Sequence, residues 1–413
     1  MAATAKMYNK VSSKSHIPND IAFSILSKLP LKSLKRFTCV QKSWSFLFQN
    51  SDFIDMFRTN FISKHDHDDD DNTCLILKEI TMTNGFGFEE HNALYTLSTD
   101  RFEDRVRLDL PPFFQENDSN IYILGSSSIN GIICLYQEIG HDTTTVLWNP
   151  ATKEFKIVPP SLQPYDNFEF NLQPYAFGYD KVRDDYKVIR NARYPDDYEG
   201  NWYCVPDKDS WYWNGDGAAD DTYWEELVVG MYDPFWEIYS LKNNSWRKLD
   251  VAHDMPDPWP CTSQLNLNGF CHWLGLVRKM WLFDFTNEKF FGTTLPSYSE
   301  GIYNNTWLKT NLLMLNGCVA FMCQYRDMNS FHIWILGELG VMESWTKLFV
   351  FGPLTCVRYS IGAGKKNDIF IVKDHGELAR FNLSTQKFEE VAVNIWQVVI
   401  YKEVLLPIEG LNK

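Results

Sequence analysis

Apolar residues recur at helical spacing from residue 17 to residue 48, close to the start of the chain. Pro18 suits the first turn of a helix, where its missing N–H would be unpaired anyway, and Asp20 places negative charge near the positive end. The predicted helices carry Ile21, Ile25, Leu26 and Leu29, then, after Pro30, Leu31, Leu34, Phe37 and Val40, and finally Trp44, Leu47 and Phe48. About forty residues cannot bury so many apolar side chains alone, so this helical head is expected to associate with a partner. The alternative is a helical cap packed on its own downstream domain.

A second pattern runs through the rest of the chain, where two aromatic residues stand seven positions apart around a polar turn. The copies are Tyr95 to Phe102, Trp148 to Phe155, Tyr239 to Trp246, Phe283 to Phe290 and Phe381 to Phe388, and a looser copy ends at Trp345. Each copy predicts a β-hairpin with an aromatic side chain anchoring both strands.

The spacing of these hairpins predicts a β-propeller. Three copies follow an Asn-Gly turn and a further apolar strand, at Asn130-Gly131, Asn268-Gly269 and Asn316-Gly317. The copies ending at Trp246, Phe290, Trp345 and Phe388 lie 44, 55 and 43 residues apart, a period typical of four-stranded blades. The alternative is a pair of stacked β-sandwiches.

We expect six or seven blades between about residue 74 and residue 406. The 91 residues from Phe155 to Trp246 have room for two blades, and residues 177–190 read as a strand pair with a charged turn. The strands from Ile395 to Leu406 are expected to pair with the first blade and close the ring.

Charge divides the chain into two parts. Residues 1–58 hold nine Lys and Arg against three Asp and Glu, whereas the whole chain carries −14, which leaves −20 for residues 59–413. So acidic a body argues against binding to nucleic acid and to anionic membrane surfaces.

The remaining composition favours a cytoplasmic and/or nuclear protein. No apolar run approaches the roughly 18 residues that a membrane span needs. Nine scattered cysteines without a CxxC pair are typical of reduced thiols. No nucleophile, phosphate-loop or metalloprotease motif is present, so we expect neither catalysis nor a cofactor.

Two segments invite sharper interpretations. His65 and His67 precede the acidic run 68–71, which suggests a metal site, but we interpret residues 63–73 as a solvated linker and expect no metal. Residues 195–226 hold ten carboxylates, one Lys and eight Trp or Tyr, a composition suited to gripping a basic target. The candidate target-binding residues there are Trp202, Trp211, Trp213 and Trp224. An insertion without a role is the alternative.

The head closely resembles the F-box. The resemblance is carried by Ile17-Pro18-x-Asp20, Ile25-Leu26-x-x-Leu29-Pro30, Leu31-Lys32-Ser33-Leu34-x-Arg36-Phe37, and Val40-x-Lys42-x-Trp44-x-x-Leu47, while Gln41 replaces the commoner Cys or Ser. It implies binding to a Skp1-type adaptor of a cullin-based ubiquitin ligase. The implied contact residues are Ile17, Pro18, Ile25, Leu29, Pro30, Leu34, Val40 and Trp44. The adaptor in that family is acidic, which suits the five basic residues without an acidic one between Lys28 and Lys42.

The body resembles the F-box-associated domain of plant F-box proteins, the kelch-like and S-locus F-box relatives, through segments such as WNPATKEFKIVPP and FGYDKVRDDYKVIR. No Trp-Asp dipeptide or Gly-Gly doublet marks a WD40 or kelch array. We therefore expect an α+β multidomain chain. Its parts are a disordered N-terminus (1–15), an all-α F-box (16–62), an acidic linker (63–73) and an all-β, propeller-like domain (74–406).

The expected function is substrate recognition within an SCF-type E3 ubiquitin ligase, with no chemistry performed by this chain. The head would bind the adaptor and through it a cullin, and the body would bind a target protein, with a basic target as one option. The alternatives are an F-box scaffold or adaptor competitor outside the ligase, and a propeller enzyme with a helical cap.

Overall fold

The computed structural model divides the chain into two compact units, Met1–Asp66 and His67–Lys413. It describes residues 17–37, 44, 46–63, 73–82, 88–98, 105–115, 120–139, 142–161, 171–193, 235–251, 264–275, 279–296, 307–325, 330–338, 344–352, 357–363, 368–373 and 376–405.

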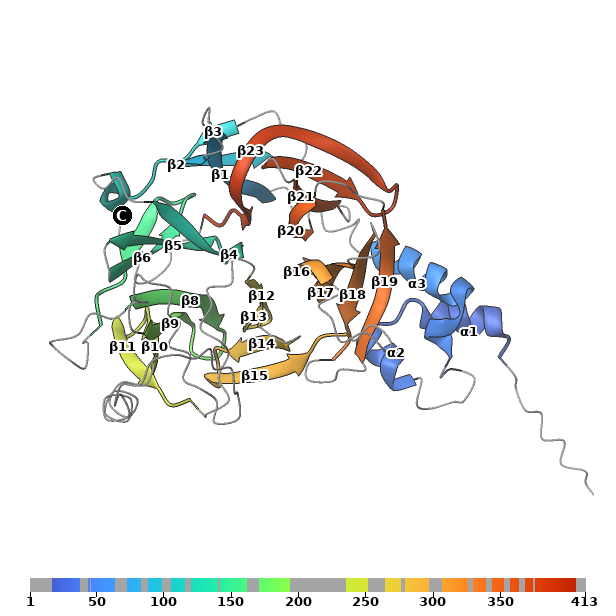
Figure 1. Ribbon diagram of the computed structural model, residues 1–413. Helices are drawn as coiled ribbons and strands as arrows, with labels where there is room; N and C mark the ends of the chain where they lie inside the picture. Colours follow the sequence, from blue (N-terminus) through green and yellow to red (C-terminus); the bar gives the residue numbers. More distant parts are fainter. Residues whose placement is uncertain are drawn as a thin grey trace, which may run out of the picture. The chain divides into compact units, whose positions relative to one another are not determined.

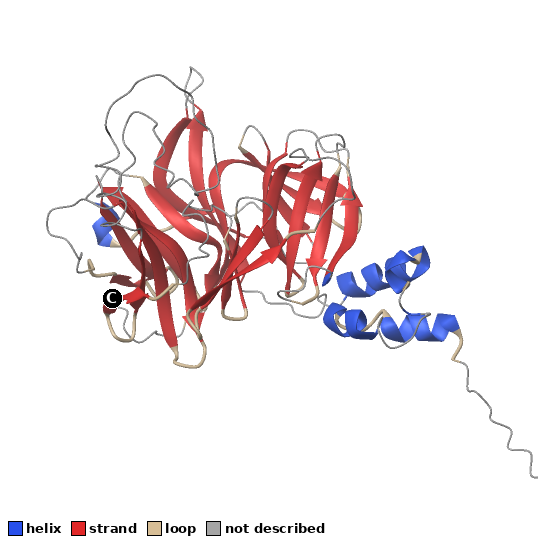
Figure 2. Cartoon of the chain, turned by 60° about the horizontal axis from the view of Figure 1, so that its bottom comes forward, coloured by secondary structure: helices blue, strands red, loops and turns tan. Residues whose placement is uncertain are grey.

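The described part of the first unit is helical (Figures 1 and 2). Its elements are α1 (Asn19–Leu26), α2 (Leu31–Phe37), the short 3-10 helix η2 (Leu47–Gln49) and α3 (Ser51–Ser63). The helices α1 and α2 begin just after Pro18 and Pro30, as the sequence predicts. Helix α3 was not predicted from the sequence, although its Phe53, Phe57 and Phe61 recur every four residues and are buried. A buried face of this kind fixes an amphipathic helix against its neighbours.

The described part of the second unit consists almost wholly of strands. Three sheets have four antiparallel strands each, which we call groups 3, 4 and 5. Group 3 is β8 (Asn171–Asp180), β9 (Asp185–Arg193), β10 (Phe235–Ser240) and β11 (Ser245–Leu249). Group 4 is β12 (Leu265–Leu267), β13 (Phe270–Leu274), β14 (Lys279–Asp284) and β15 (Lys289–Thr294). Group 5 is β16 (Trp307–Leu315), β17 (Cys318–Tyr325), β18 (Phe331–Leu336) and β19 (Trp345–Phe351).

The remaining eleven described strands form one sheet that divides into three further groups. Group 2 is β4 (Ile121–Ile129), β5 (Ile132–Ile139), β6 (Asp142–Asn149) and β7 (Glu154–Ile157). Group 6 is β20 (Val357–Ala363), β21 (Asp368–Lys373), β22 (Glu377–Asn382) and the first half of β23 (Lys387–Lys402). Group 1 is the second half of β23, β1 (Thr73–Met82), β2 (Phe88–Ser98) and β3 (Arg105–Arg107), and the short helix η3 (Pro112–Gln115) follows it.

Strand β23 closes the ring, as the sequence predicts. Its first half pairs with β22, and from Ile395 to Lys402 it pairs antiparallel with β1, the first strand of the unit. Ile400 also lies opposite Ser127 of β4, in parallel register. One 16-residue strand therefore links the last, first and second groups, which leaves no free inner edge between them.

Neighbouring groups share apolar cores all the way round the second unit (Figure 1). Representative pairs are Ile76 and Trp148 for groups 1 and 2, Leu147 and Val188 for 2 and 3, Trp236 and Trp273 for 3 and 4, Leu282 and Phe321 for 4 and 5, and Leu77 and Phe370 for 1 and 6. Groups 5 and 6 meet through the stacked rings of Phe351 and Phe381, whose centroids are 4.5 Å apart. Burial between sheets thus replaces a single central core.

The aromatic repeat sets the register of four hairpins. Directly opposed across the strands are Trp148 and Phe155, Tyr239 and Trp246, Phe283 and Phe290, and Phe381 and Phe388. The looser copy that ends at Trp345 also forms a strand pair, in which Trp345 lies opposite Leu336. Cross-strand aromatic pairs of this kind stabilise a sheet and fix its register.

Each of these hairpins has a four-residue turn whose last residue adopts the left-handed backbone conformation, with positive φ. These residues are Lys153, Asn244, Glu288 and Gln386, in chain order. An Asn or Asp side chain caps three of the turns: Asn149 Oδ1 accepts a hydrogen bond from the Ala151 N–H, and Asp284 and Asn382 do the same in theirs. The three Asn-Gly turns have positive φ at both residues, as two-residue hairpins require.

One prediction about the body is wrong, and another stays a prediction. Tyr95 lies opposite Arg107, not Phe102, because the second strand of that hairpin is the three-residue β3 and starts at Arg105. Phe102 itself lies outside the described residues. The stretch from Phe155 to Trp246 was given room for two blades. After β7 its described strands form group 3, and residues 162–170 and 194–234 lie outside the described residues, so a second blade there stays a prediction. The predicted strand pair within 177–190 is present as β8 and β9.

Candidate functional site

Helix α1 has two apolar faces. Ala22 and Leu26 form a buried face, and Phe23 meets Phe53 of α3 edge to face at 5.4 Å. On the other face, Ile21 is 49% exposed and Ile25 is 57% exposed, and Ile17, which precedes the helix, is 58% exposed. This stripe of three isoleucines is called the Ile stripe below. Large apolar side chains gathered on a surface in this way mark interaction sites.

Among the described residues of the head, Phe46 (62%) and Met56 (36%) are further exposed apolar side chains. Among the described basic residues of the head, Lys28 and Arg36 are exposed. A hydrogen bond of 2.7 Å from Asn60 Nδ2 to Ser27 Oγ ties α3 to the end of α1 and steadies the helix that carries the Ile stripe.

The structure separates the implied adaptor contacts into three sets. Ile17, Pro18, Ile25 and Pro30 are exposed, Leu29 and Trp44 are partly buried, and Leu34 is fully buried. In this structure Leu34 therefore supports the packing of α2 and offers no outward surface. Trp44 stands edge to face with Phe37 at 6.0 Å. Val40 lies outside the described residues.

Ile21, Phe46 and Met56 belong to the exposed apolar surface and were not among the adaptor contacts that the sequence implied. The four-residue spacing of Ile21 and Ile25 was the signal that could have identified Ile21, because both lie in α1 and residues so spaced share one helix face. No comparable sequence signal marks Phe46 or Met56.

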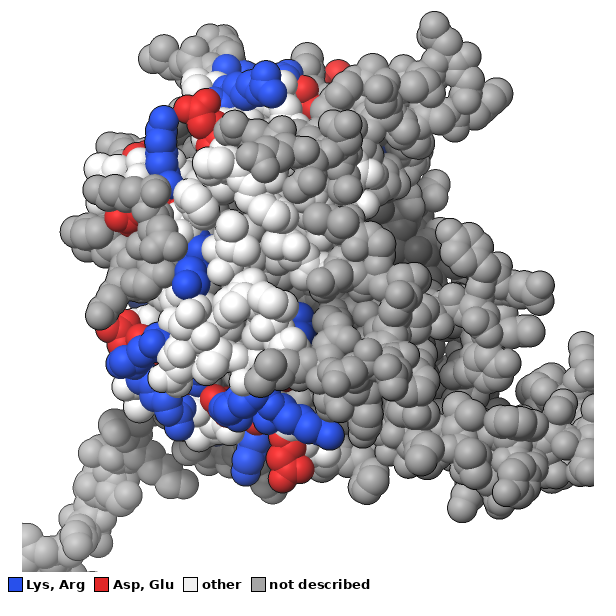
Figure 3. All heavy atoms as spheres, turned by 90° about the vertical axis from the view of Figure 1, so that its left-hand side faces the viewer, with Lys and Arg blue, Asp and Glu red and all other residues white. Residues whose placement is uncertain are grey.

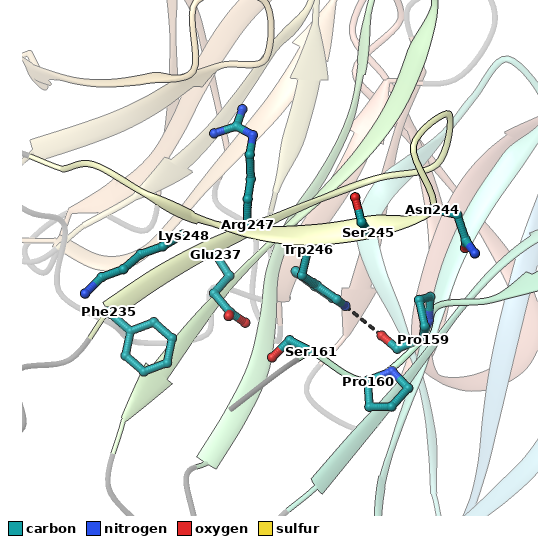
Figure 4. A pocket seen from close by; sticks show the side chains of 10 residues that line it. All are labelled: Pro159, Pro160, Ser161, Phe235, Glu237, Asn244, Ser245, Trp246, Arg247 and Lys248. Atoms are coloured by element: carbon teal, nitrogen blue, oxygen red, sulfur yellow. Dashed lines mark hydrogen bonds between the residues drawn. The ribbon is translucent and has the colours of Figure 1, made fainter. Parts of the chain in front are cut away.

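The body holds a pocket of about 380 Å³ between β11 and the segment that follows β7 (Figure 4). Its walls are Pro159, Pro160, Phe235 and Trp246, with Ser161, Arg247 and Lys248 among its polar residues. Trp246 Nε1 donates a 2.6 Å hydrogen bond to the carbonyl of Pro159. That bond fastens the end of group 2 onto the outermost strand of group 3.

The polar groups behind this first pocket are already engaged. Arg190 Nε donates to Glu237 Oε2 at 2.9 Å, and the guanidinium also bonds Ser161 and lies over the Trp246 ring, 4.0 Å from its centre. Glu237 and Arg190 are both buried. A buried charge paired and hydrogen-bonded in this way holds structure together and is not free to meet a ligand.

A second pocket, of about 540 Å³, lies where turns of groups 2, 3 and 4 meet the end of β23. Its lining includes Asn130, Lys181, Asn268, Phe285, Lys402 and Val404. Asn130 is held by a hydrogen bond from its Nδ2 to the hydroxyl of Tyr186, and Lys402 N–H donates to Ser128 Oγ.

A buried charge cluster lies beside this pocket. Lys187 Nζ donates to Asp180 Oδ2 at 2.8 Å and to Glu288 Oε1 at 2.9 Å. Burial alone would raise the pKa of both carboxyl groups, but the hydrogen bonds from the basic side chains outweigh it and lower both pKa values. Both carboxylates therefore stay ionised around neutral pH and are neutralised within the protein.

The exposed charges of group 3 are mainly basic. They are Lys181, Arg183, Lys242, Arg247 and Lys248, against Asp184 and, just after β11, Asp250. Figure 3 shows Lys and Arg side chains gathered along the lower edge of the face on the left-hand side of Figure 1. The described surface of this sheet is thus basic although the body as a whole is acidic.

The candidate target-binding residues Trp202, Trp211, Trp213 and Trp224 lie outside the described residues. Within the described part of the chain, no three His, Cys, Asp or Glu side chains come together as metal ligands would. The histidines and aspartates of the predicted linker are likewise outside it. No described helix has the length and apolarity needed to cross a membrane.

Comparison with known proteins identifies the body. Residues 88–406 match the family model of the F-box associated beta propeller domain. F-box protein CPR1 of Arabidopsis thaliana is 24% identical over 402 residues, which covers 91% of this chain and 84% of that protein. The F-box/kelch-repeat protein At3g23880 of the same plant is 22% identical over 82% of this chain and 80% of its own length.

A solved structure, an oligogalacturonate lyase in complex with manganese, covers 73% of this chain at 11% identity and a TM-score of 0.35, which is too low to support any inference. The family match covers most of the chain and fits the groups of antiparallel strands described above. The chain belongs to the plant F-box proteins that carry an F-box-associated β-propeller domain. The resemblance stated from the sequence is thereby confirmed for the family, and the β-propeller class is confirmed for the body.

Proposed function

We propose that this chain is the substrate-recognition subunit of an SCF-type E3 ubiquitin ligase. Its head, residues 16–62, binds a Skp1-type adaptor and through it a cullin. Its body, residues 74–406, binds a target protein in the cytoplasm and/or the nucleus. Ubiquitin transfer belongs to other subunits, and this chain contributes by holding the target close to them.

The observation that carries the proposal is the Ile stripe on α1. The head buries Ala22 and Leu26 and still leaves Ile17, Ile21 and Ile25 about half exposed. In a member of this family, a second apolar face on the first helix of the head is best explained by an adaptor that covers it. Transfer of each isoleucine from water into such an interface contributes about 1.5–3 kcal/mol.

A pull-down with purified adaptor and cullin tests the proposal. The double variant Ile21→Asp/Ile25→Asp is expected to lose binding by a factor of at least about ten, because two charges would be buried against the adaptor. Both positions are exposed, so the variant should keep its fold. The matched control is Val182→Asp in the body, where an apolar side chain 77% exposed is replaced in the same way.

Retention of the adaptor by Ile21→Asp/Ile25→Asp would contradict the proposed interface. Binding of the adaptor without co-purification of the cullin would instead favour the scaffold or competitor outside the ligase. A triple variant Pro18→Ala/Leu29→Ala/Trp44→Ala would be less suitable, because Trp44 packs on Phe37 and its loss would disturb the head itself.

For the body we propose a six-bladed propeller in which groups 1 to 6 are the blades. Six four-stranded groups among the described residues, and the closure by β23, support this number. The proposal that the acidic stretch 195–226 grips a basic target stays open, and deletion of residues 197–222 tests it. Unchanged folding and unchanged target binding in that deletion variant would reject the idea.

A further inference from the structure

The second pocket differs from the first in that no carboxylate stands among its described lining residues, whereas Glu237 lines the first. In the first pocket the buried guanidinium of Arg190 and the carboxylate of Glu237 neutralise one another. The second pocket is lined by Lys181 and Lys402, and no Asp or Glu stands among the described residues that line it. In a chain of net charge −14, a pocket lined by the exposed Lys181 and by no described carboxylate favours negative charge.

The carboxylates closest to Lys181 along the chain are already occupied. Asp180 accepts hydrogen bonds from Lys187 and Arg183, each at 2.8 Å, and Asp184 accepts one from the Tyr179 hydroxyl. Lys181 is exposed and forms no ion pair with any residue that the structure describes. Its ammonium group is therefore available to an anion from outside.

Short turns keep this pocket open. Asn130-Gly131 and Asn268-Gly269 adopt positive φ at both residues and turn the chain within two residues, so these hairpins have no longer loop to lay over the pocket. Gly178 lets Phe285 form a wall, because a Cβ at position 178 would lie 2.0 Å from the Phe285 ring. The shape of the pocket thus depends on the backbone geometry of the two Asn-Gly turns and on the close packing of Phe285 against Gly178.

The other walls are apolar. Ile129, Leu267, Phe270, Phe285 and Val404 face the pocket beside the amides of Asn130 and Asn268. A volume of about 540 Å³ is within the range of small-ligand sites. Apolar walls, a few amides and a basic rim suit an organic carboxylate with an apolar body.

We infer that this pocket binds a carboxylate carried on an apolar group, with Lys181 as its principal charge partner. Two sources have this chemistry, a small organic acid and the C-terminal residue of a peptide chain. The inference concerns the body alone and does not depend on adaptor binding by the head. Its failure would therefore leave the proposed function standing.

Calorimetric titration of the full chain tests the inference. The probes are 3-phenylpropanoate, its neutral amide 3-phenylpropanamide, and the peptide acetyl-Ala-Ala-Phe with a free or an amidated C-terminus. At least one carboxylate is expected to bind about tenfold more tightly than its amide, because only the carboxylate pairs with the ammonium group. Tighter binding by the free peptide identifies a chain terminus as the source, and tighter binding by phenylpropanoate identifies a small acid.

The variant Lys181→Gln is expected to weaken carboxylate binding by about a factor of five to ten and to leave amide binding unchanged. The control is Lys387→Gln, an exposed lysine at a turn of group 6 that does not line the pocket. Equal binding by acid and amide, equal binding by Lys181→Gln and the full-length protein, or no carboxylate binding up to about 1 mM would overturn the inference. Melting temperatures of both variants confirm that they are folded.

Discussion

The ammonium group of Lys187 lies 2.9 Å from Oε1 of Glu288 and so joins strand β9 of group 3 to the β14–β15 turn of group 4. Its two other hydrogen bonds go to Asp180 Oδ2 at 2.8 Å and to the carbonyl of Phe285 at 2.9 Å. All three N–H groups of this buried lysine are therefore used, one within its own sheet and two across the boundary between groups.

Replacement of Lys187 by Met is expected to lower the free energy of unfolding by about 3–5 kcal/mol, because it leaves Asp180 buried and without its main partner. Urea unfolding followed by tryptophan fluorescence measures the loss. The matched control is Arg183→Gln. Arg183 is a second partner of Asp180, and the arginine side chain is 57% exposed.

The Arg183→Gln control should cost at most about 1 kcal/mol, since solvent screens an exposed pair. If Lys187→Met were no more destabilising than Arg183→Gln, the joint between groups 3 and 4 would depend on apolar packing alone. The double variant Lys187→Met/Asp180→Leu should recover part of the loss, because it removes the stranded charge as well.

A buried histidine predicts a second effect, on pH. His272 lies opposite Leu265 and its Nδ1 donates to the Leu265 carbonyl at 3.1 Å. Burial lowers the pKa of His272 from 6.5 to about 4. Between these two values the unfolded chain binds a proton that the folded protein does not, so stability is complete above about pH 6.5 and falls as the pH drops.

Replacement of His272 by Asn keeps a hydrogen-bond donor and removes the titrating group. Relative to this variant, the protein is expected to lose up to about 3 kcal/mol of its free energy of unfolding between about pH 7 and about pH 4. The pKa of His332 is also lowered by burial, but His332 is present in both proteins and cancels in the difference. If the unfolding free energies of the two proteins changed with pH in parallel, the pKa of His272 would be the same in the folded and the unfolded chain, and the prediction would be wrong.

The aromatic repeat predicts a third effect, on coupling between strands. The rings of Phe283 and Phe290 meet edge to face across β14 and β15, with centroids 4.8 Å apart. A double-mutant cycle with Phe283→Leu and Phe290→Leu is expected to give a coupling energy of about 0.5–1.5 kcal/mol. The control cycle pairs Phe283→Leu with Phe388→Leu, an aromatic residue of group 6, and should give a coupling energy near zero.

The body was predictable because its signals are local. Seven-residue aromatic spacing fixes the register of a hairpin with a four-residue turn, and Asn-Gly fixes a two-residue turn, so Trp148 with Phe155 and Asn268-Gly269 could be placed from the sequence alone. The closure by β23 followed from the same logic, since a ring of strands needs its last strand to cover the first edge.

What the sequence could not provide depends on contacts between distant residues. Leu34 and Ile25 are both apolar residues of the head, yet one is buried and the other half exposed, and only the packing of the helices decides which. The second pocket is lined by residues more than two hundred positions apart in the sequence. No local sequence pattern indicates that Lys402 lies in the same pocket as Lys181.

The last prediction concerns the close approach that completes the ring. Gly131 has a φ of +80°, and a Cβ placed on it would lie 2.7 Å from Cβ of Val404. Asn149 Nδ2 holds the same residue through a 3.0 Å hydrogen bond to the Val404 carbonyl, so the end of the closing strand cannot move aside freely. Gly131→Ala is therefore expected to cost about 2–4 kcal/mol, the sum of backbone strain and overpacking.

Gly317→Ala separates the two contributions. Gly317 occupies the same position in an Asn-Gly turn, with a φ of +69°, but a Cβ there would meet nothing within 4 Å. Its replacement should cost only the strain, about 1 kcal/mol. Removing the opposing Cβ in Gly131→Ala/Val404→Gly, measured against Val404→Gly alone, should bring the loss at position 131 down towards that value. Urea unfolding could instead give the same loss of unfolding free energy for Gly131→Ala and Gly317→Ala. In that case the contact with Val404 would contribute nothing to closure of the ring, and the hydrogen bonds of β23 alone would close it.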